Sequence, residues 1–220
     1  MESYELCAVI PCFNEVGSIG AVVRAVLQFV AVIWVVDDGS ADGTGAEAER
    51  AGATVIRLER NLGKGAALRE GLKAARGAGF KFAVTLDGDG QHDAGDVAEL
   101  LKAARGGADL VIGNRMGSSG VMPWVRCFVN RWMSGRLARR LGVECPDSQC
   151  GFRVIRLDAW EKLELRQNRF EVESEMLAAF ARAGMKIAFV PVKCLPAKRA
   201  SRIRPIVDSV RWFRWFVNLK

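Results

Sequence analysis

Two aspartates and a glutamine follow directly after an apolar run near the middle of the chain. The run Phe82–Leu86 is typical of a buried strand, and Asp87, Asp89 and Gln91 come immediately after it. Oxygen ligands crowded at a strand end suit a hard divalent cation such as Mg²⁺ or Mn²⁺, and such a cation suits a diphosphate. An acidic turn that caps a helix beginning near Asp93 is the competing interpretation of the same residues.

Apolar runs alternate with segments of helical periodicity through the first half of the chain. This alternation predicts an α/β fold with a Rossmann-like, mostly parallel sheet and helices on both of its faces. The predicted strands are residues 6–12, 32–36, 54–58, 82–86 and 110–113, and the predicted helices are residues 17–29, 44–50, 64–76 and 94–105.

Polar side chains follow four of the predicted strands. Ligands of open parallel sheets bind outside the carboxyl ends of the strands, so these side chains are expected to share one edge. Helix capping requires only single Ser, Asp or Asn residues, so paired carboxylates favour a ligand site there. The strand-end residues are Pro11 to Glu15, then Asp37 and Asp38, then Asp87 and Asp89, then Asn114 and Arg115.

The usual phosphate-binding loops are incomplete in this chain. No Gly-x-Gly-x-x-Gly follows the first strand, and Gly63-Lys64-Gly65 lacks both the preceding glycine of a Walker loop and the Ser or Thr after its lysine. A metal bridging two phosphates through Asp87 and Asp89 is the remaining way to neutralise a nucleotide diphosphate. The sequence therefore predicts a nucleotide-sugar enzyme.

Positive charge is concentrated in two segments of a chain whose formal net charge is +7. Residues 115–143 hold six arginines and no acid, and residues 193–220 hold eight basic residues against Asp208 alone. Both segments also carry aromatic residues, which is typical of helices in a membrane interface, although an amphipathic helix packed on the sheet is the alternative. For the C-terminal segment we favour a membrane or a partner, because Trp212, Phe213, Trp215 and Phe216 cover more than one helical stripe. We expect one α/β domain over residues 1–200 and a basic, aromatic amphipathic helix within residues 201–220.

Six scattered cysteines without a Cys-x-x-Cys pair indicate buried thiols in a reducing compartment, and a zinc site is not expected with His92 as the only histidine. The N-terminus shows no secretory signal, and no apolar run is long enough to cross a membrane. These features predict a cytoplasmic protein, peripheral at the inner membrane face.

Taken together, the motifs resemble those of the GT-A glycosyltransferases of family 2, and within them the dolichyl-phosphate and polyprenyl-phosphate sugar transferases. In chain order, the motifs that carry the resemblance are Ile10–Glu15, Val36–Thr44, Asn61–Gly65, Asp87–His92, Gly113–Arg115 and Asp147–Arg153. The similarity extends over about residues 6 to 202.

The resemblance implies a role for each matching residue. It implies Asp89 and Arg115 as the catalytic pair, and a metal held by Asp87, Asp89 and Gln91. The acceptor phosphate would be read by Arg115 and by a family Ser-Lys pair that appears here as Ser201-Arg202, and the arginine-rich segment adds Arg131. The nucleotide sugar would be bound by Pro11, Phe13, Glu15, Val36, Asp38, Asp87, Gly88 and Asp89.

A phosphate acceptor fits the side chains available for chemistry. Transfer to a hydroxyl needs a general base, whereas a phosphate monoester is already ionised at neutral pH. His92 is interpreted as a group that orients a neighbour rather than as a catalyst. Glu173, which lies in a run with Glu171 and Glu175, either faces the sugar, orients an arginine or lies on a solvated helix face.

The predicted function is metal-dependent, inverting transfer of a hexose from a GDP- or UDP-sugar to a polyprenyl phosphate, with Mg²⁺ or Mn²⁺ as cofactor. Transfer to a hydroxyl of a saccharide or small molecule on the same fold is the first alternative. A nucleic-acid-binding module is a remote one, since basic residues among aromatics can follow a phosphate backbone. That reading leaves the acidic strand ends unexplained, so nucleic acid is not an expected partner.

Overall fold

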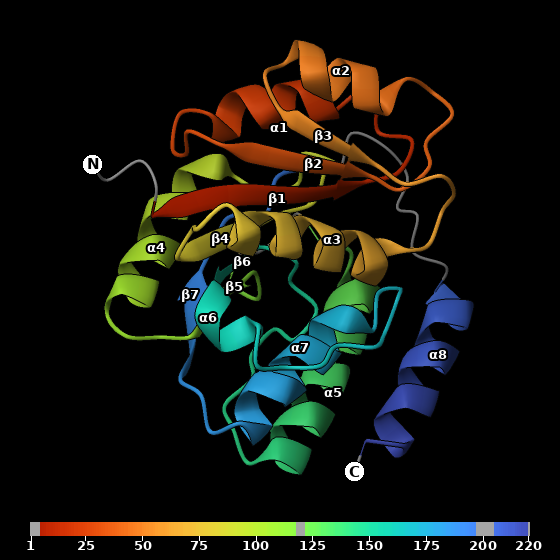
Figure 1. The fold of residues 1–220 in the computed structure, drawn as a ribbon. Helices are drawn as coiled ribbons and strands as arrows, with labels where there is room; N and C mark the ends of the chain where they lie inside the picture. The colour runs from red at the N-terminus through yellow and green to blue at the C-terminus, as the bar shows by residue number, and fades with distance from the viewer. Residues whose placement is uncertain (1–4, 118–121, 197–204, 220) are drawn as a thin grey trace.

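Seven strands pair into one sheet in the order β3-β2-β1-β4-β6-β5-β7 (Figure 1). The computed structural model describes residues 5–117, 122–196 and 205–219. All pairings are parallel except those of β6, which lies antiparallel between β4 and β5. The strands are β1 (Leu6–Cys12), β2 (Ile33–Asp37), β3 (Thr54–Arg57), β4 (Phe82–Thr85), β5 (Leu110–Asn114), β6 (Arg153–Arg156) and β7 (Ile187–Pro191).

The predicted mostly parallel sheet is confirmed, and the first five strands begin and end within two residues of the predicted bounds. Neither β6 nor β7 was predicted. Strand β6 is only four residues long and has an arginine at each end, so its apolar signal is reduced to Val154 and Ile155. Its antiparallel direction also departs from the strand-helix alternation of the first half.

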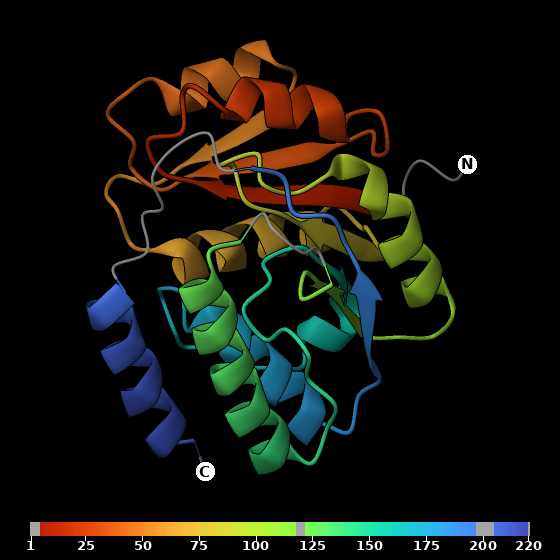
Figure 2. The ribbon, with the colours of Figure 1, turned by 180° about the vertical axis from the view of Figure 1, so that it is seen from behind.

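Helices cover both faces of the sheet, as predicted (Figures 1 and 2). Helices α1 and α2 lie on one face, and α3 lies on the other with α6 and α7 beside it. Helix α3 approaches the sheet closely at Gly71, where an added Cβ would lie 2.3 Å from Val9 Cγ1. The helices are α1 (Ile19–Val26), α2 (Thr44–Arg50), α3 (Lys64–Gly77), α4 (Val97–Arg105) with the short 3-10 helix η1 (Ala94–Asp96) before it, α5 (Trp124–Leu141), α6 (Leu157–Trp160), α7 (Val172–Arg182) and α8 (Pro205–Val217).

The core lies between the sheet and its two helical layers. All seven residues of β1 are buried, as is usual for a central parallel strand that is covered on both faces. Burying aliphatic side chains contributes about 25 cal/mol for each Å² of apolar surface removed from water. All six cysteines are unpaired, and Cys7, Cys12, Cys145 and Cys150 are buried, which confirms the expected buried thiols at those four positions.

Helices α5 and α8 run side by side below the sheet (Figures 1 and 2). Their contact includes Trp132 and Trp212, whose ring centroids are 6.0 Å apart. Trp212 is buried, whereas Phe213, the next residue, is 51% exposed. The C-terminal helix therefore packs on its own domain with one side and presents apolar residues to the surroundings with the other. Within the described ranges, none of the helices combines the length and apolarity that crossing a bilayer demands.

Candidate active site

The carboxyl ends of β1, β2 and β4 meet at one edge of the sheet. The Asp38 backbone N–H donates to the carbonyl of Cys12 over 2.8 Å, and Pro11 lies opposite Val36 in the strand register. Gly88 packs so closely that an added Cβ would lie 2.7 Å from Cys12 Sγ. The residues that are predicted to bind the nucleotide sugar therefore lie next to one another at the ends of these strands. Pro11 and Val36 are buried in the sheet, and Gly88 is needed for close packing.

Asp38 connects the end of β2 to the loop that precedes α3. Its buried carboxylate accepts backbone hydrogen bonds from Leu62 (2.7 Å) and Gly63 (2.8 Å). Burial raises the pKa of Asp38, and these two hydrogen bonds oppose the shift only in part. Phe13 and Glu15 are half-buried at the same edge, where the Glu15 backbone N–H donates to Thr44 Oγ1 over 2.7 Å.

Lys64, the first residue of α3, lies between two carboxylates. Its Nζ is 2.5 Å from Asp87 Oδ1 and 2.5 Å from Glu173 Oε1. Gly151 covers this cluster, because a Cβ there would lie within 3.1 Å of all three charged groups. Burial disfavours the charge of Asp87, yet Lys64 and then the His92 contact hold the pKa of Asp87 well below its usual range. Asp87 is therefore a carboxylate at neutral pH.

The His92 side chain is buried and contacts Asp87. The His92 residue is 8% exposed, and its Nε2 is 3.4 Å from Asp87 Oδ2. Its ring packs on Phe152 with centroids 5.1 Å apart. His92 therefore lies in contact with the Asp87 carboxylate that it is expected to orient. The Glu173 side chain pairs with Lys64, and the Glu173 backbone carbonyl accepts from Arg153.

Asp89 and Gln91 form a tight turn beyond β4. Asp89 Oδ1 accepts the Gln91 backbone N–H over 3.0 Å, and Gln91 Nε2 donates to Asp89 Oδ2. Among the described residues, no three carboxylate, histidine or cysteine side chains gather into a preformed metal cage. Mg²⁺ commonly binds through one or two carboxylates, with substrate phosphates and water completing its shell. The half-exposed Asp87 and Asp89 carboxylates fit that kind of site.

Arg115 lies just beyond β5 and pairs with the fully buried Asp147. Its Nε donates to Asp147 Oδ2 over 2.8 Å and its Nη2 donates to Oδ1 over 2.9 Å. Asn130 Nδ2 donates to the same Oδ1 over 2.8 Å. Burial alone would raise the pKa of Asp147, but Arg115 and these hydrogen bonds lower it below its usual value. The pair fixes the Arg115 guanidinium in one orientation.

Cys194 connects the acidic edge with the arginines. It forms an isolated antiparallel bridge with His92, and the next residue, Leu195, donates its N–H to the Gln91 carbonyl over 2.9 Å. Burial raises the pKa of the Cys194 thiol, and the charges that act on it include Arg115 and Arg126, which lower it, and Asp89, which raises it. Charges of both signs therefore act on the Cys194 thiol.

The structure describes only part of the predicted acceptor-phosphate site. Arg131 is exposed on α5, next to the buried Asn130 that contacts Asp147. Ser201 and Arg202 lie outside the described residues. Arg126, one turn before Asn130, was not singled out by sequence; it is half-buried, and its charge lowers the pKa of the Cys194 thiol.

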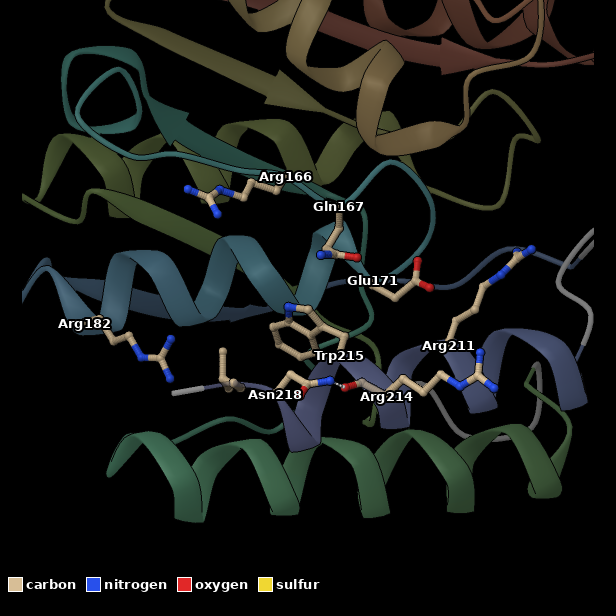
Figure 3. A pocket seen from close by; sticks show the side chains of 9 residues that line it. Arg166, Gln167, Glu171, Arg182, Arg211, Arg214, Trp215 and Asn218 are labelled. Atoms are coloured by element: carbon tan, nitrogen blue, oxygen red, sulfur yellow. Dashed lines mark hydrogen bonds between the residues drawn. The ribbon is translucent and has the colours of Figure 1, made fainter.

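A separate cavity of about 550 Å³ lies between α7, α8 and the segment before α7 (Figure 3). Four arginines line it together with the buried Glu171, and Trp215 extends from α8 toward α7. None of the residues that are predicted to bind the metal or the nucleotide sugar lines this cavity. The cavity marks incomplete packing of α8 on α7. The lining arginines are Arg166, Arg182, Arg211 and Arg214.

The sequence did not reveal which residues pair with Asp87 and Arg115 at the strand ends. Lys64 was noticed only as a fragment of a phosphate loop, and Asp147 only as part of a motif. Their roles depend on contacts to residues far away in sequence.

Comparisons with known proteins agree with this architecture. Residues 7–164 match the model of glycosyl transferase family 2. The chain is 33% identical to the polyprenol monophosphomannose synthase of Mycolicibacterium smegmatis, over 71% of this chain and 63% of that protein. It is 30% identical to the undecaprenyl-phosphate mannosyltransferase of Micrococcus luteus, over 84% of this chain and 81% of that protein.

The fold also matches a solved structure. Glucosyl-3-phosphoglycerate synthase from Mycobacterium tuberculosis, crystallised with Mn²⁺, UDP and its product, superposes with a TM-score of 0.75 at 24% identity. The match covers 98% of this chain and 78% of that chain, and at this identity it establishes the shared GT-A fold alone. The expected family is confirmed: the chain belongs to glycosyl transferase family 2 and is a glycosyltransferase.

Proposed function

We propose that this enzyme transfers a hexose from a nucleotide diphosphate sugar to a polyprenyl phosphate at a membrane surface. One observation carries the proposal: the segment after β7 contacts both groups of residues, since the Val192 N–H donates to the carbonyl of Asn114, the neighbour of Arg115, over 3.1 Å, and the Leu195 N–H donates to the carbonyl of Gln91 over 2.9 Å. A donor diphosphate bound through a metal and an anionic acceptor bound through arginine can therefore meet in one place. The two relatives named for polyprenyl-phosphate mannosyl transfer support the same acceptor.

The donor would occupy the edge formed by β1, β2 and β4. The nucleoside would be bound by Pro11, Phe13, Glu15, Val36 and Asp38. The diphosphate would be bound by Asp87, Gly88, Asp89 and Gln91. Mg²⁺ or Mn²⁺ held by Asp87, Asp89 and Gln91 would neutralise negative charge on the departing nucleoside diphosphate. Lys64 contacts Asp87 Oδ1 and His92 contacts Asp87 Oδ2, and both contacts keep this carboxylate charged.

The acceptor would enter beside Arg115, with Arg126 and Arg131 on α5 and Ser201 and Arg202 as further proposed contacts. Guanidinium groups hold phosphate oxygens through charge-assisted hydrogen bonds, and holding two reactants in line lowers the barrier. An acceptor oxygen would attack the anomeric carbon as the bond to the nucleoside diphosphate breaks, which inverts that carbon. The oxygen is already anionic at neutral pH, so no side chain must remove a proton.

The outer faces of α5 and α8 suit a lipid surface. Both helices expose large apolar side chains beside arginines, a composition that favours an interface with anionic head groups. The acceptor's isoprenoid tail would be held by the same bilayer. The exposed residues are Trp124, Val125, Phe128 and Trp132 on α5 and Val207, Val210, Phe213 and Val217 on α8.

The test is transfer from radiolabelled nucleotide sugars to undecaprenyl or dolichyl phosphate in detergent micelles, with Mn²⁺, with Mg²⁺ and with EDTA. Matched reactions contain the unphosphorylated polyprenol or soluble sugars and phosphoglycerate. The proposal expects a glycosylated lipid only when the lipid is phosphorylated and a metal is present. Transfer to the alcohol or to a soluble hydroxyl, with none to the phosphate, would contradict it.

A further inference from the structure

A chain of hydrogen bonds connects α8 with Arg115. Trp212 Nε1 on α8 donates to Ser174 Oγ on α7 over 2.8 Å, and Gln149 Nε2 donates to the same oxygen over 2.8 Å. Gln149 Nε2 also donates to Ser148 Oγ over 2.8 Å. The amide group of Gln149 thus links the C-terminal helix to the loop that follows α5.

The chain continues from Ser148 to the acidic partner of Arg115. The Ser148 and Ser134 hydroxyl oxygens are 3.0 Å apart, and Ser134 Oγ is 3.0 Å from Asn130 Oδ1. Asn130 then donates to Asp147, which holds Arg115. A hydroxyl has one hydrogen and the Asn130 amide oxygen can only accept, so Ser148 donates to Ser134 and Ser134 donates to Asn130, whereas Ser174 Oγ accepts from both Trp212 and Gln149.

Burial makes this chain costly to break. Trp212 is 2% exposed, Ser134 is 1% exposed, and Ser148, Ser174 and Asp147 are 0% exposed. A buried polar group without its partner costs about 1 to 3 kcal/mol, and bonds in a fully satisfied chain strengthen one another. The buried Arg153 adds support, because its guanidinium donates to the carbonyls of Ser148 and Glu173. The segment from Asp147 to Cys150 is therefore held in one position.

Several residues anchor α8 and the residues that follow it, among them the buried Trp212 and the buried Leu219, whose carbonyl accepts from Arg140 Nη2. The 550 Å³ cavity separates part of it from α7, whereas Trp212 fills the contact. Trp212 stacks on Phe216 with ring centroids 4.9 Å apart and lies against Trp132 of α5. Trp212 is thus the point at which α8 is joined both to the aromatic contact with α5 and to the polar chain.

We propose that Trp212 is a positioning residue for the acceptor site: by docking α8 through its indole N–H, it fixes the loop that holds Asp147 and thereby orients Arg115. The acceptor role of Arg115 rests on the function proposed above. Because Phe213, the next residue of α8, is exposed, the helix that would rest on the lipid surface also supports the arginine that would receive the lipid phosphate.

The test uses Trp212→Phe, which removes the indole N–H and keeps an aromatic ring in the stack. Trp215→Phe is the matched control, since it makes the same chemical change one turn along the helix, in the cavity wall. Two readouts are needed: the KM for polyprenyl phosphate and for the nucleotide sugar in detergent micelles, and hydrogen exchange at the backbone amides of Ser148 and Gln149, which donate within the network.

Trp212→Phe should raise the acceptor KM about fivefold, leave the donor KM within about twofold and speed exchange at both amides, since one buried hydrogen bond contributes about 1 kcal/mol. Ser174→Ala should do at least the same, because it also removes the acceptor of Gln149 Nε2, and the double variant should be no worse than Ser174→Ala, which already lacks the bond to Trp212. Trp215→Phe should change neither readout.

Unchanged exchange in Trp212→Phe would overturn the coupling, and so would equal effects on both KM values or full additivity with Ser174→Ala. The exchange readout needs no substrate. If the wild-type enzyme fails to use polyprenyl phosphate, the proposed function fails on that result, while hydrogen exchange still decides whether α8 positions the loop.

Discussion

Lys64 Nζ and Glu173 Oε1 lie 2.5 Å apart although 109 residues separate them in the chain. Glu173 also lies beside Gly151, and Lys64 reaches Asp87 on the other side. One largely buried ammonium group thus compensates two carboxylates, one just after β4 and one on α7, and joins the two halves of the fold at the candidate site.

Lys64→Met should lower the free energy of unfolding by about 3 kcal/mol, because removing one partner of a buried ion pair leaves uncompensated charge. Urea denaturation at pH 7 measures the change. Lys73→Met removes a lysine whose side chain is 63% exposed from the same helix and should cost little. Adding Glu173→Gln to Lys64→Met should recover part of the loss; no recovery would argue against charge compensation by Lys64.

Arg115→Met should reverse the direction in which Asp147 makes stability depend on pH. In the wild type the pKa of Asp147 is lowered, so its contribution to stability is present above its unfolded pKa near 3.8 and is lost as the pH falls below it. Without Arg115, burial should raise the pKa of Asp147, and the native state would then hold a proton that the unfolded state releases. The free energy of unfolding should therefore fall as the pH rises from 5 to 8.

Denaturant unfolding across that pH range provides the measurement. The double variant Arg115→Met/Asp147→Asn lacks the titrating carboxyl and should show no such slope. A flat profile in the single variant would mean that Asp147 is compensated by other groups.

Asp89→Asn should remove the metal-dependent part of nucleotide binding and slow transfer about 100-fold, a loss typical of removing one charge-stabilising group. The thermal shift given by UDP or GDP with and without Mn²⁺ measures binding separately from turnover. Asp158→Asn, an exposed aspartate on α6, should leave both unchanged. An undiminished metal-dependent shift in Asp89→Asn would exclude Asp89 as a ligand.

Phe213→Ser combined with Val217→Ser should weaken association with anionic liposomes by at least tenfold, because both exposed apolar side chains lie on the face of α8 proposed to meet the lipid. Sedimentation with vesicles of increasing anionic lipid content measures it. Phe29→Ser, at a similarly exposed phenylalanine after α1, is the control. An equal loss of liposome binding in the double variant and in Phe29→Ser would show that any exposed phenylalanine contributes and that the face of α8 is not specific for lipid.

The local pattern of the sequence determined the first-half strands and helices and the acidic strand ends. Five strands and their intervening helices follow from apolar runs and helical periodicity, because each element signals itself within about ten residues. The gathering of Asp38, Asp87 and Arg115 at one edge also follows, because parallel strands all end on the same side of a sheet. The family motifs then predicted the chemistry that the comparisons confirm at the level of glycosyl transfer.

Only the tertiary structure decided which partner each charged group has. The antiparallel insertion of β6 brings Gly151 over Lys64, and the packing of α7 places Glu173 beside it. The orientation of Arg115 depends on Asp147, and the position of α8 on a tryptophan that reaches Ser174. Local periodicity shows which face of an element is apolar, but the element it packs against follows from the summed packing of the whole chain, and buried charges take the partners that packing supplies.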